Sequence, residues 1–318
     1  MSGPRVHRLS YAVDVDAPAG VVYALIADTT QWPLFVPPSI HVERLDFDGV
    51  HDRFRMWATA NGGVSSWLSR RTLDAYARRI EFRQELPAPP LLAMGGSWTV
   101  EELGRSRCRL VLRHEFEVAA DRPGDAEWVR RATDTNSRAE LAQLKETAER
   151  WDRLDALLLT FEDAVRVKGP AQLVYDFLYG VADWPGQVPH VARAEVAEHT
   201  PGVQVVSMDL HTGDGRVQST ESVRICFPYA GRIVHKQTRP PALLAAHAGE
   251  WSLVPDETGV TAIAQHRVLL REEAVEAELG PGARLSDARR HVREALGKAG
   301  IGMLELARRH AESAVRSL

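Results

Sequence analysis

The chain has 318 residues, and its second half repeats the first at a spacing of 152 to 153 residues. The matches keep their order along both halves, which chance does not produce. A solenoid repeat is only about 20–45 residues long and contacts only its neighbours, whereas each copy here is long enough to bury its own core. The sequence therefore predicts two domains of one fold, at residues 1–153 and 157–318. The matching pairs include Val22 and Val174, Trp32 and Trp184, Ser69 and Ser222, Arg71 and Arg224, Trp98 and Trp251, and His114 and His266.

The composition is that of an ordinary globular protein, with 44% hydrophobic residues and a net charge of −4. We therefore expect neither nucleic acid nor a membrane as a partner, because both attract basic surfaces. No apolar run approaches the roughly 20 residues that cross a bilayer, and the first residues lack the apolar core of a secretory signal. Two cysteines cannot build a disulfide framework. We expect a cytoplasmic protein with no cofactor and no metal, since the sequence has no phosphate loop, dinucleotide motif or metal-ligand spacing.

The expected elements follow one order in both copies. In the first copy a strand leads into a short helix at residues 19–27, and Trp32-Pro33 ends this helical section. Several strands follow, and a long helix closes the copy. Asn61-Gly62 predicts a hairpin turn between two of the strands. The long helices are expected at residues 127–153 and from Ser286 onward. This order is typical of the α+β class. We expect two tandem helix-grip domains, each a curved antiparallel sheet around its long C-terminal helix, with an interior cavity.

Strand alternation assigns polar side chains to the inner face of each sheet, because successive side chains point to opposite faces. Trp67, Ser69 and Arg71 share one face, and His114 shares a face with two leucines. Each has a plain alternative: the arginine can pair with a buried carboxylate, the histidine can be a satisfied core residue, and the tryptophans can be core packing. The combination in both copies favours a small-molecule cavity with apolar walls and few polar groups. The second copy places Thr220, Ser222, Arg224 and His266 on the same faces.

Several stretches resemble the bacterial type II polyketide aromatase/cyclases. They are residues 22–28, Trp32-Pro33, and residues 41–45, 57–62, 67–71 and 94–98. The tandem form resembles the di-domain subclass of these enzymes. The resemblance implies a START and Bet v 1 type of helix-grip fold. It also implies a cofactor-independent enzyme that cyclises and dehydrates the first ring of a poly-β-ketone, with carbons 7 and 12 joined. Its partners would be the acyl carrier protein that holds the chain and other synthase subunits.

The resemblance also implies roles for residues of the first copy. Arg71 matches the key pocket arginine, and Ser69 matches the pocket serine. The expected substrate-binding residues of this copy are Trp32, Phe35, Arg55, Trp57, Trp67, Met94 and Trp98. Some relatives carry a pocket tyrosine after the Trp-Pro pair; no tyrosine matches it here, and Phe35 is the nearest aromatic residue.

The chemistry of these residues suggests a mechanism. Arg71 does not deprotonate in proteins, so it would polarise a carbonyl rather than act as a base. Ser69 would position the substrate. Either His114, whose pKa range suits proton transfer, or an ordered water held by Ser69 would shuttle protons. In the second copy we assign the same roles to Arg224, Ser222 and His266. There the expected substrate-binding residues are Trp184, Thr220, His247 and Trp251.

Two alternatives stay open at this point. The second copy is either catalytic or purely structural. The rival function for the whole chain is non-catalytic binding or transport of lipids or other hydrophobic ligands, as START-type domains do, because fold alone does not determine function.

Overall fold

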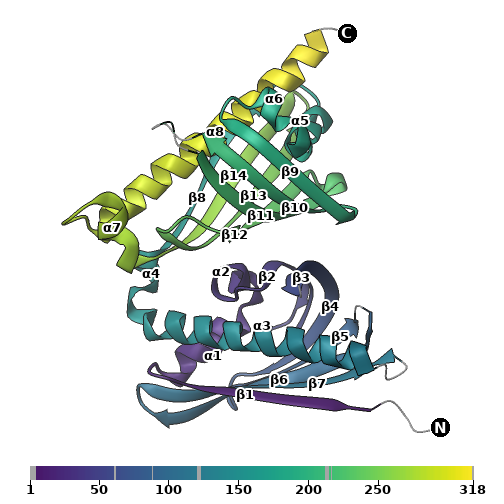
Figure 1. Ribbon diagram of the computed structural model, residues 1–318, viewed down its shortest axis with the longest axis vertical. Helices are drawn as coiled ribbons and strands as arrows, with labels where there is room; N and C mark the ends of the chain where they lie inside the picture. The colour runs from purple at the N-terminus through teal and green to yellow at the C-terminus, as the bar shows by residue number, and fades with distance from the viewer. Residues whose placement is uncertain are drawn as a thin grey trace. The chain divides into compact units, whose positions relative to one another are not determined.

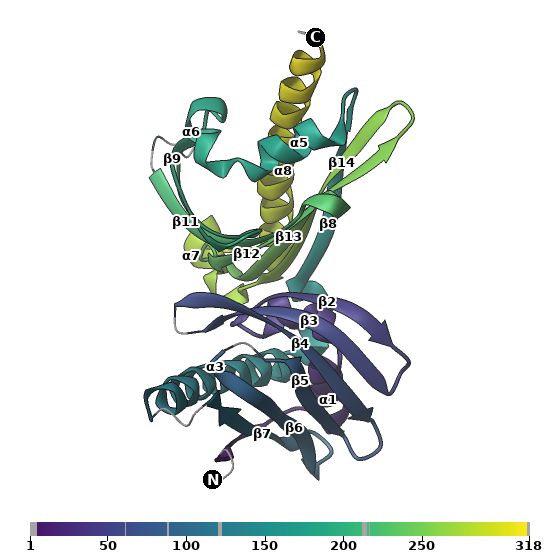
Figure 2. The same ribbon diagram turned by 90° about the vertical axis from the view of Figure 1, so that its right-hand side faces the viewer.

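The computed structural model describes residues 5–60, 62–87, 89–119, 123–211, 215 and 217–316. The chain divides into two compact units, Met1–Leu154 and Asp155–Leu318. Each unit consists of one antiparallel sheet that curves around one long helix (Figures 1 and 2). The α+β class and the two helix-grip folds predicted from the sequence are confirmed.

The first unit has a seven-stranded sheet in the order β1-β7-β6-β5-β4-β3-β2. The strands β3 and β4 pair as a hairpin, in which Ala60 faces Gly63, and Asn61 of the expected turn lies outside the described residues. The elements are β1 (His7–Val15), α1 (Ala19–Ala27), α2 (Trp32–Phe35), β2 (Ser39–Phe47), β3 (His51–Ala60), β4 (Gly63–Asp74), β5 (Arg79–Leu86), β6 (Leu91–Gly104), β7 (Arg107–Val118) and α3 (Pro123–Glu149).

The second unit repeats this arrangement, with the order β8-β14-β13-β12-β11-β10-β9. Its long helix begins at Leu285, one residue before the expected start, and the carboxylate of Asp287 accepts a hydrogen bond from the Arg284 backbone N–H. The elements are α4 (Leu154–Leu157), β8 (Leu158–Val167), α5 (Ala171–Tyr179), α6 (Trp184–Gln187), β9 (Val191–Thr200), β10 (Val203–His211), β11 (Val217–Phe227), β12 (Arg232–Arg239), β13 (Leu244–Asp256), β14 (Gly259–Leu270), α7 (Val275–Leu279) and α8 (Leu285–Arg316).

The face of helix α3 that meets the sheet is polar in one part and apolar in another. Toward its C-terminal end the stripe carries Leu141, Leu144 and Ala148, which are almost fully buried. One or two turns earlier the same stripe carries Thr133 and Ser137. Positions three, four and seven apart lie on one helix face, so the two groups meet the same sheet. The apolar half closes a core, and the polar half leaves room for a cavity.

A buried arginine ties the short helix α1 to the sheet. Arg71 is 2% exposed and donates from Nη1 to the Ile26 carbonyl (2.8 Å) and from Nη2 to the Ala27 carbonyl (2.6 Å). Nη2 also donates to Asp52 Oδ2 at 2.5 Å, and Asp52 lies opposite Arg71 on the neighbouring strand. The last carbonyls of a helix have no partner within the helix. The guanidinium therefore supplies hydrogen bonds to the last carbonyls of α1 and also neutralises a buried carboxylate.

The second unit has the same anchor with a different partner. Arg224 donates to the carbonyls of Leu178 (2.5 Å) and Tyr179 (3.5 Å) at the end of α5. Gln204 takes the place of Asp52 and accepts from Arg224 at 3.0 Å. Gln204 in turn donates to Glu198 at 2.9 Å, so in this network a carboxylate is linked to Arg224 only through Gln204.

We expect Asp52→Asn to destabilise the protein by about 3–5 kcal/mol, because it leaves the Arg71 charge buried without its counter-ion. Urea unfolding of the full chain, followed by tryptophan fluorescence, measures the loss. The matched control is Glu102→Gln, which breaks the exposed Arg78–Glu102 pair (2.8 Å) and should cost about 1 kcal/mol or less. Equal losses in both variants would contradict a structural role for the buried pair.

Candidate functional site

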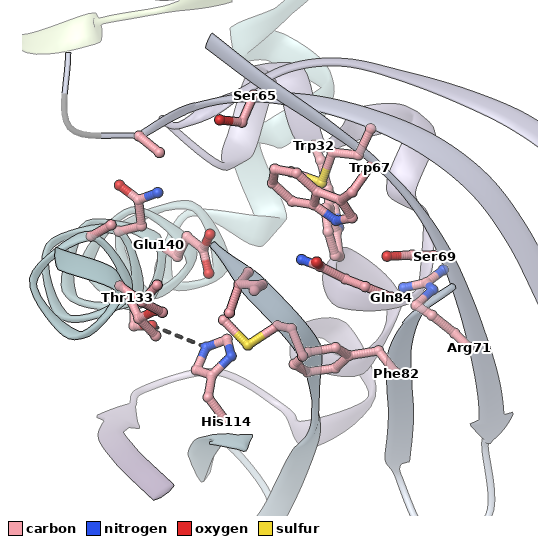
Figure 3. Close-up of a pocket in the computed structure, with 18 of the residues that line it drawn as sticks. Trp32, Ser65, Trp67, Ser69, Arg71, Phe82, Gln84, His114, Thr133 and Glu140 are labelled. Atoms are coloured by element: carbon pink, nitrogen blue, oxygen red, sulfur yellow. Dashed lines mark hydrogen bonds between the residues drawn. The ribbon is translucent and has the colours of Figure 1, made fainter. Parts of the chain in front are cut away.

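The first unit encloses a cavity between its sheet and residues 128–140 of α3 (Figure 3). The cavity has a volume of about 170 Å³. Its wall is mainly aromatic and apolar, with Phe54, Met56 and Phe82 on the strands and Trp128 and Val129 on α3. This is the usual form of a small-molecule site.

Seven of the residues expected in the first copy line this cavity: Trp32, Trp67, Ser69, Arg71, Met94, Trp98 and His114. They come from four different elements, α2, β4, β6 and β7, so only the folded chain brings them together. The strand parity that assigned Ser69, Arg71 and His114 to the inner face therefore places them as expected. Their functional roles stay a prediction.

Three expected residues do not line the cavity. Arg55 is exposed, because Phe54 and Met56 on either side of it point inward and alternation turns Arg55 to the other face of β3. Trp57 shares that outer face, where its ring lies 5.6 Å from the ring of His41. Phe35 is 3% exposed within α2 but is not part of the cavity wall. The placement expected for these three side chains was wrong.

The sequence left open whether Arg71 pairs with a buried carboxylate, and the structure shows its partners. Its terminal nitrogens are occupied by the two carbonyls and Asp52, and its guanidinium carbon lies 5.4 Å from the Trp32 ring and 5.3 Å from the Phe54 ring. The ion pair with a buried carboxylate therefore exists. Arg71 nevertheless forms part of the cavity wall.

His114 presents a neutral imidazole to the cavity. Its Nε2 lies 3.1 Å from the Ser137 hydroxyl on α3, the contact drawn as a dashed line in Figure 3. Its Nδ1 is buried and has no hydrogen-bond partner in the described part of the chain. Burial lowers the pKa of His114 to about 4, because the charged form is costly away from water. At neutral pH the ring therefore keeps a lone pair available for a proton.

Glu140 is a cavity residue that the sequence analysis missed. It lies one turn after Ser137 on α3, and Figure 3 shows its carboxyl group pointing from the helix into the cavity. Burial raises the pKa of Glu140 to about 8, so the group is mostly protonated at neutral pH. The sequence did hold a signal for this position. Glu140 lies four residues before the buried Leu144, and a glutamate on the inner stripe of a helix interrupts an apolar face.

The residues expected in the second copy also gather on the inner side of their sheet. Arg224 contacts the end of α5, which places Ser222 and Thr220, at alternating positions of β11, on the same inner face. His247 Nε2 lies 3.0 Å from His266 Nδ1, and both rings are buried. Trp184 is buried in α6 and donates from Nε1 to the Phe177 carbonyl at 3.0 Å. Trp251 packs against the core of this unit.

Two further observations bear on what the molecule can bind. Within the described ranges, no group of three or more His, Cys, Asp or Glu side chains is placed to hold a metal ion. In the same ranges, no helix is both long and apolar enough to cross a membrane.

The chain is similar to curated polyketide synthase proteins along nearly its whole length. The granaticin polyketide synthase bifunctional cyclase/dehydratase of Streptomyces violaceoruber is 37% identical over 317 residues, which cover 99% of this chain and 96% of that protein. The actinorhodin polyketide synthase bifunctional cyclase/dehydratase of Streptomyces coelicolor is 40% identical over 309 residues, which cover 93% and 94%.

Solved structures and a protein family agree with these relatives. The di-domain ARO/CYC BexL from the BE-7585A biosynthetic pathway is 42% identical, with a TM-score of 0.85 over 96% of this chain and 99% of that one. The di-domain ARO/CYC StfQ from the steffimycin pathway is 33% identical, with a TM-score of 0.82 over 97% and 99%. Residues 6–149 match the family described as polyketide cyclase / dehydrase and lipid transport. The chain therefore belongs to the polyketide synthase cyclase/dehydratases, enzymes that here have the di-domain architecture of the ARO/CYC proteins.

Proposed function

We propose that this protein closes and dehydrates the first ring of a poly-β-ketone carried on an acyl carrier protein, joining carbons 7 and 12. The observation that carries the proposal is the pairing of a neutral imidazole, His114, with a protonated carboxyl, Glu140, on one apolar cavity. Ring closure needs both a base and an acid. The carrier-bound substrate and the choice of carbons are supported by the resemblance to type II aromatase/cyclases, and other synthase subunits are the expected partners.

The cavity wall supplies the positioning. A flexible polyketone has many possible aldol partners along its chain, and each free conformation has a small chance of the correct approach. Trp67, Trp98 and Met94 narrow the space in which the chain folds back on itself. Holding the reacting carbons together can contribute several kcal/mol, about 7–11 in well-aligned intramolecular reactions.

The polar groups then perform an aldol addition. His114 takes a proton from a methylene between two carbonyls, which leaves an enolate. The enolate carbon attacks the distant carbonyl carbon, whose oxygen becomes an alkoxide, and Glu140 gives that oxygen its proton. The positive charge of Arg71 and the Ser69 hydroxyl stabilise the negative oxygen as it develops. The product of this step is a cyclic β-hydroxy ketone, and loss of water from it completes the ring.

The second unit is assigned a related role. We propose that Arg224 and Ser222 act on a carbonyl as Arg71 and Ser69 do, with His266 in the proton-transfer machinery. Trp184, Thr220, His247 and Trp251 would contact the ligand. The support is their common position on the inner side of the second sheet.

Reconstitution tests the function against ligand transport, which the matched family's description also includes. With a minimal polyketide synthase, we expect the protein to replace spontaneous shunt products by one product with a defined first ring, read out by mass spectrometry and NMR. Running the assay with and without a ketoreductase identifies the substrate form. An unchanged product mixture together with tightly co-purified lipid would favour transport.

We expect Glu140→Gln to reduce ring closure by about 10²–10⁴-fold, because it removes the proton donor but keeps the shape. In the wild type, the rate should fall as the pH rises through about 8, where Glu140 loses its proton, and as it drops toward about 4, where His114 gains one. The variant should lose the alkaline limb. Rate–pH profiles of both proteins measure this.

Stability gives an independent readout for Glu140. Its pKa is raised on folding from 4.5 to about 8, so the folded protein resists ionisation and loses stability as the pH rises between these values. Glu140→Gln should therefore be more stable than the wild type above pH 8, by about 1–3 kcal/mol. The control Glu146→Gln, on the exposed face of the same helix beside Arg150, should change neither rate nor stability. A control that behaves like Glu140→Gln would contradict the role.

For Arg71 we expect Arg71→Lys to lower ring closure by about 10²–10³-fold, because a lysine places its charge differently against the cavity wall. Arg224→Lys is the matched control, since Arg224 makes the same helix-end contacts in the second unit. Ring closure should stay near the wild-type rate in that control, because the carbonyl assigned to Arg224 reacts in the second unit, after the ring has closed. If both variants lost ring closure to the same extent, with the same loss of stability, Arg71 would act only as an anchor.

A further inference from the structure

The second sheet carries imidazoles where the first sheet carries apolar side chains. Phe82 of β5 lies opposite Gly96, and His235 of β12 lies opposite Gly249, so the two positions correspond. In the same way, His247 of β13 takes the place of Met94 of β6. The second unit therefore gains two titratable rings on its inner face.

In the long helices the difference runs the other way, because here the first unit has the polar side chains and the second unit lacks them. His114 contacts Ser137 on α3, whereas a Cβ on Gly300 of α8 would lie 3.1 Å from His266 Nε2, so Gly300 corresponds to Ser137. The same spacing aligns Glu140 with Met303, and it aligns three pairs of buried residues: Leu141 with Leu304, Leu144 with Ala307, and Ala148 with Ala311. The second unit thus has a thioether where the first has its carboxylic acid.

The three imidazoles form one connected cluster. His247 Nδ1 lies 3.0 Å from Gln237 Oε1, which can only accept, so this nitrogen carries the hydrogen. His247 Nε2 must then accept from His266 Nδ1 at 3.0 Å, and His266 Nε2 keeps a lone pair. That nitrogen is buried, and no group of the described chain bonds to it. The His235 ring lies 5.6 Å from the His247 ring and 6.5 Å from the His266 ring.

His235 is the member of the cluster that is not fully buried. It is half-buried, and neither of its ring nitrogens has a hydrogen-bond partner in the described part of the chain. Burial, the neighbouring His247 and His266 and the Arg224 cation all lower its pKa, so the ring is neutral at pH 7. Protein cores are packed to the density of organic crystals, so partial exposure of inward-facing side chains requires open space beside them. The inward-facing residues that are half-buried here are Thr220, Ser222, His235, Gln237 and Trp251.

We propose that His235, backed by the His247–His266 pair, forms a second acid–base site whose ligand is an uncharged cyclic β-hydroxy ketone. The proposal rests on the ring closure assigned above to the first unit, which makes such a compound. His235 takes the proton from the carbon next to the carbonyl, and a carbon–carbon double bond forms as the carbon–oxygen bond to the hydroxyl breaks. The departing oxygen takes the proton back from the imidazolium, so one water leaves and no oxidant or reductant is needed. Arg224 and Ser222, on the adjacent strand, stabilise the enolate between these steps.

A synthetic ketol tests the site without ring closure. The full-length protein is mixed with a six-membered cyclic β-hydroxy ketone, and the enone is followed by its ultraviolet absorbance. We expect wild-type dehydration and a loss of about 10²–10⁴-fold in His235→Phe, which restores the first unit's residue. His235→Gln should show the same loss, and its thermal unfolding shows whether the fold is intact. His199→Gln, at an exposed position of β9, should keep the wild-type rate.

The outcomes separate this site from the first one. Glu140→Gln should dehydrate the ketol at the wild-type rate while failing in ring closure, because its carboxyl lies in the first unit. Wild-type dehydration rates in both His235 variants would overturn the second site, and so would a wild-type protein that leaves the ketol unchanged. If Glu140→Gln alone lost ketol dehydration, water loss would belong to the first cavity. Normal ring closure in Glu140→Gln, with lost dehydration in His235→Phe, would refute only the first site.

Discussion

A buried guanidinium joins the end of the first helix to the middle of the sheet in each unit, and the cavity wall is built on that junction. Arg71 donates to two carbonyls that a helix end leaves open, and it forms an ion pair with Asp52. Trp32 lies a few residues after the end of α1, and its ring packs against the same guanidinium. A buried charge without its partner costs several kcal/mol, so this part of the chain has little freedom to move. The aromatic wall is consequently held in a fixed place.

The same apolar surroundings that make the cavity hydrophobic also keep its reactive groups neutral. Desolvation raises the pKa of Glu140 and lowers that of His114. Each group is then in the form that the proposed aldol addition requires, an acid with its proton and a base without one. A neutral pair also avoids the cost of holding separate charges in the cavity while the substrate enters.

The two units share one fold but carry different side chains on their inner faces. Both units keep the arginine anchor and the inward histidine, which shows that the framework tolerates large changes at other inner positions. The first unit has Ser137 and Glu140 on its helix, and the second has His235 and His247 on its sheet. The common sheet register and helix contacts hold these exchanged groups in comparable positions. The same fold can therefore carry its inner titratable groups on the helix or on the sheet.

The sequence by itself determined the repeat, the α+β class and the inward placement of Ser69, Arg71 and His114, because periodicity and strand alternation are local properties of the chain. Arg55 and Trp57 were misplaced even though the same alternation, counted from Phe54, turns them outward. Only the tertiary structure paired Asp52 with Arg71, set Glu140 against the cavity and brought the three histidines of the second unit together. These contacts depend on strand register and on the rotation of each long helix about its axis. Both are set by packing between segments far apart in the sequence.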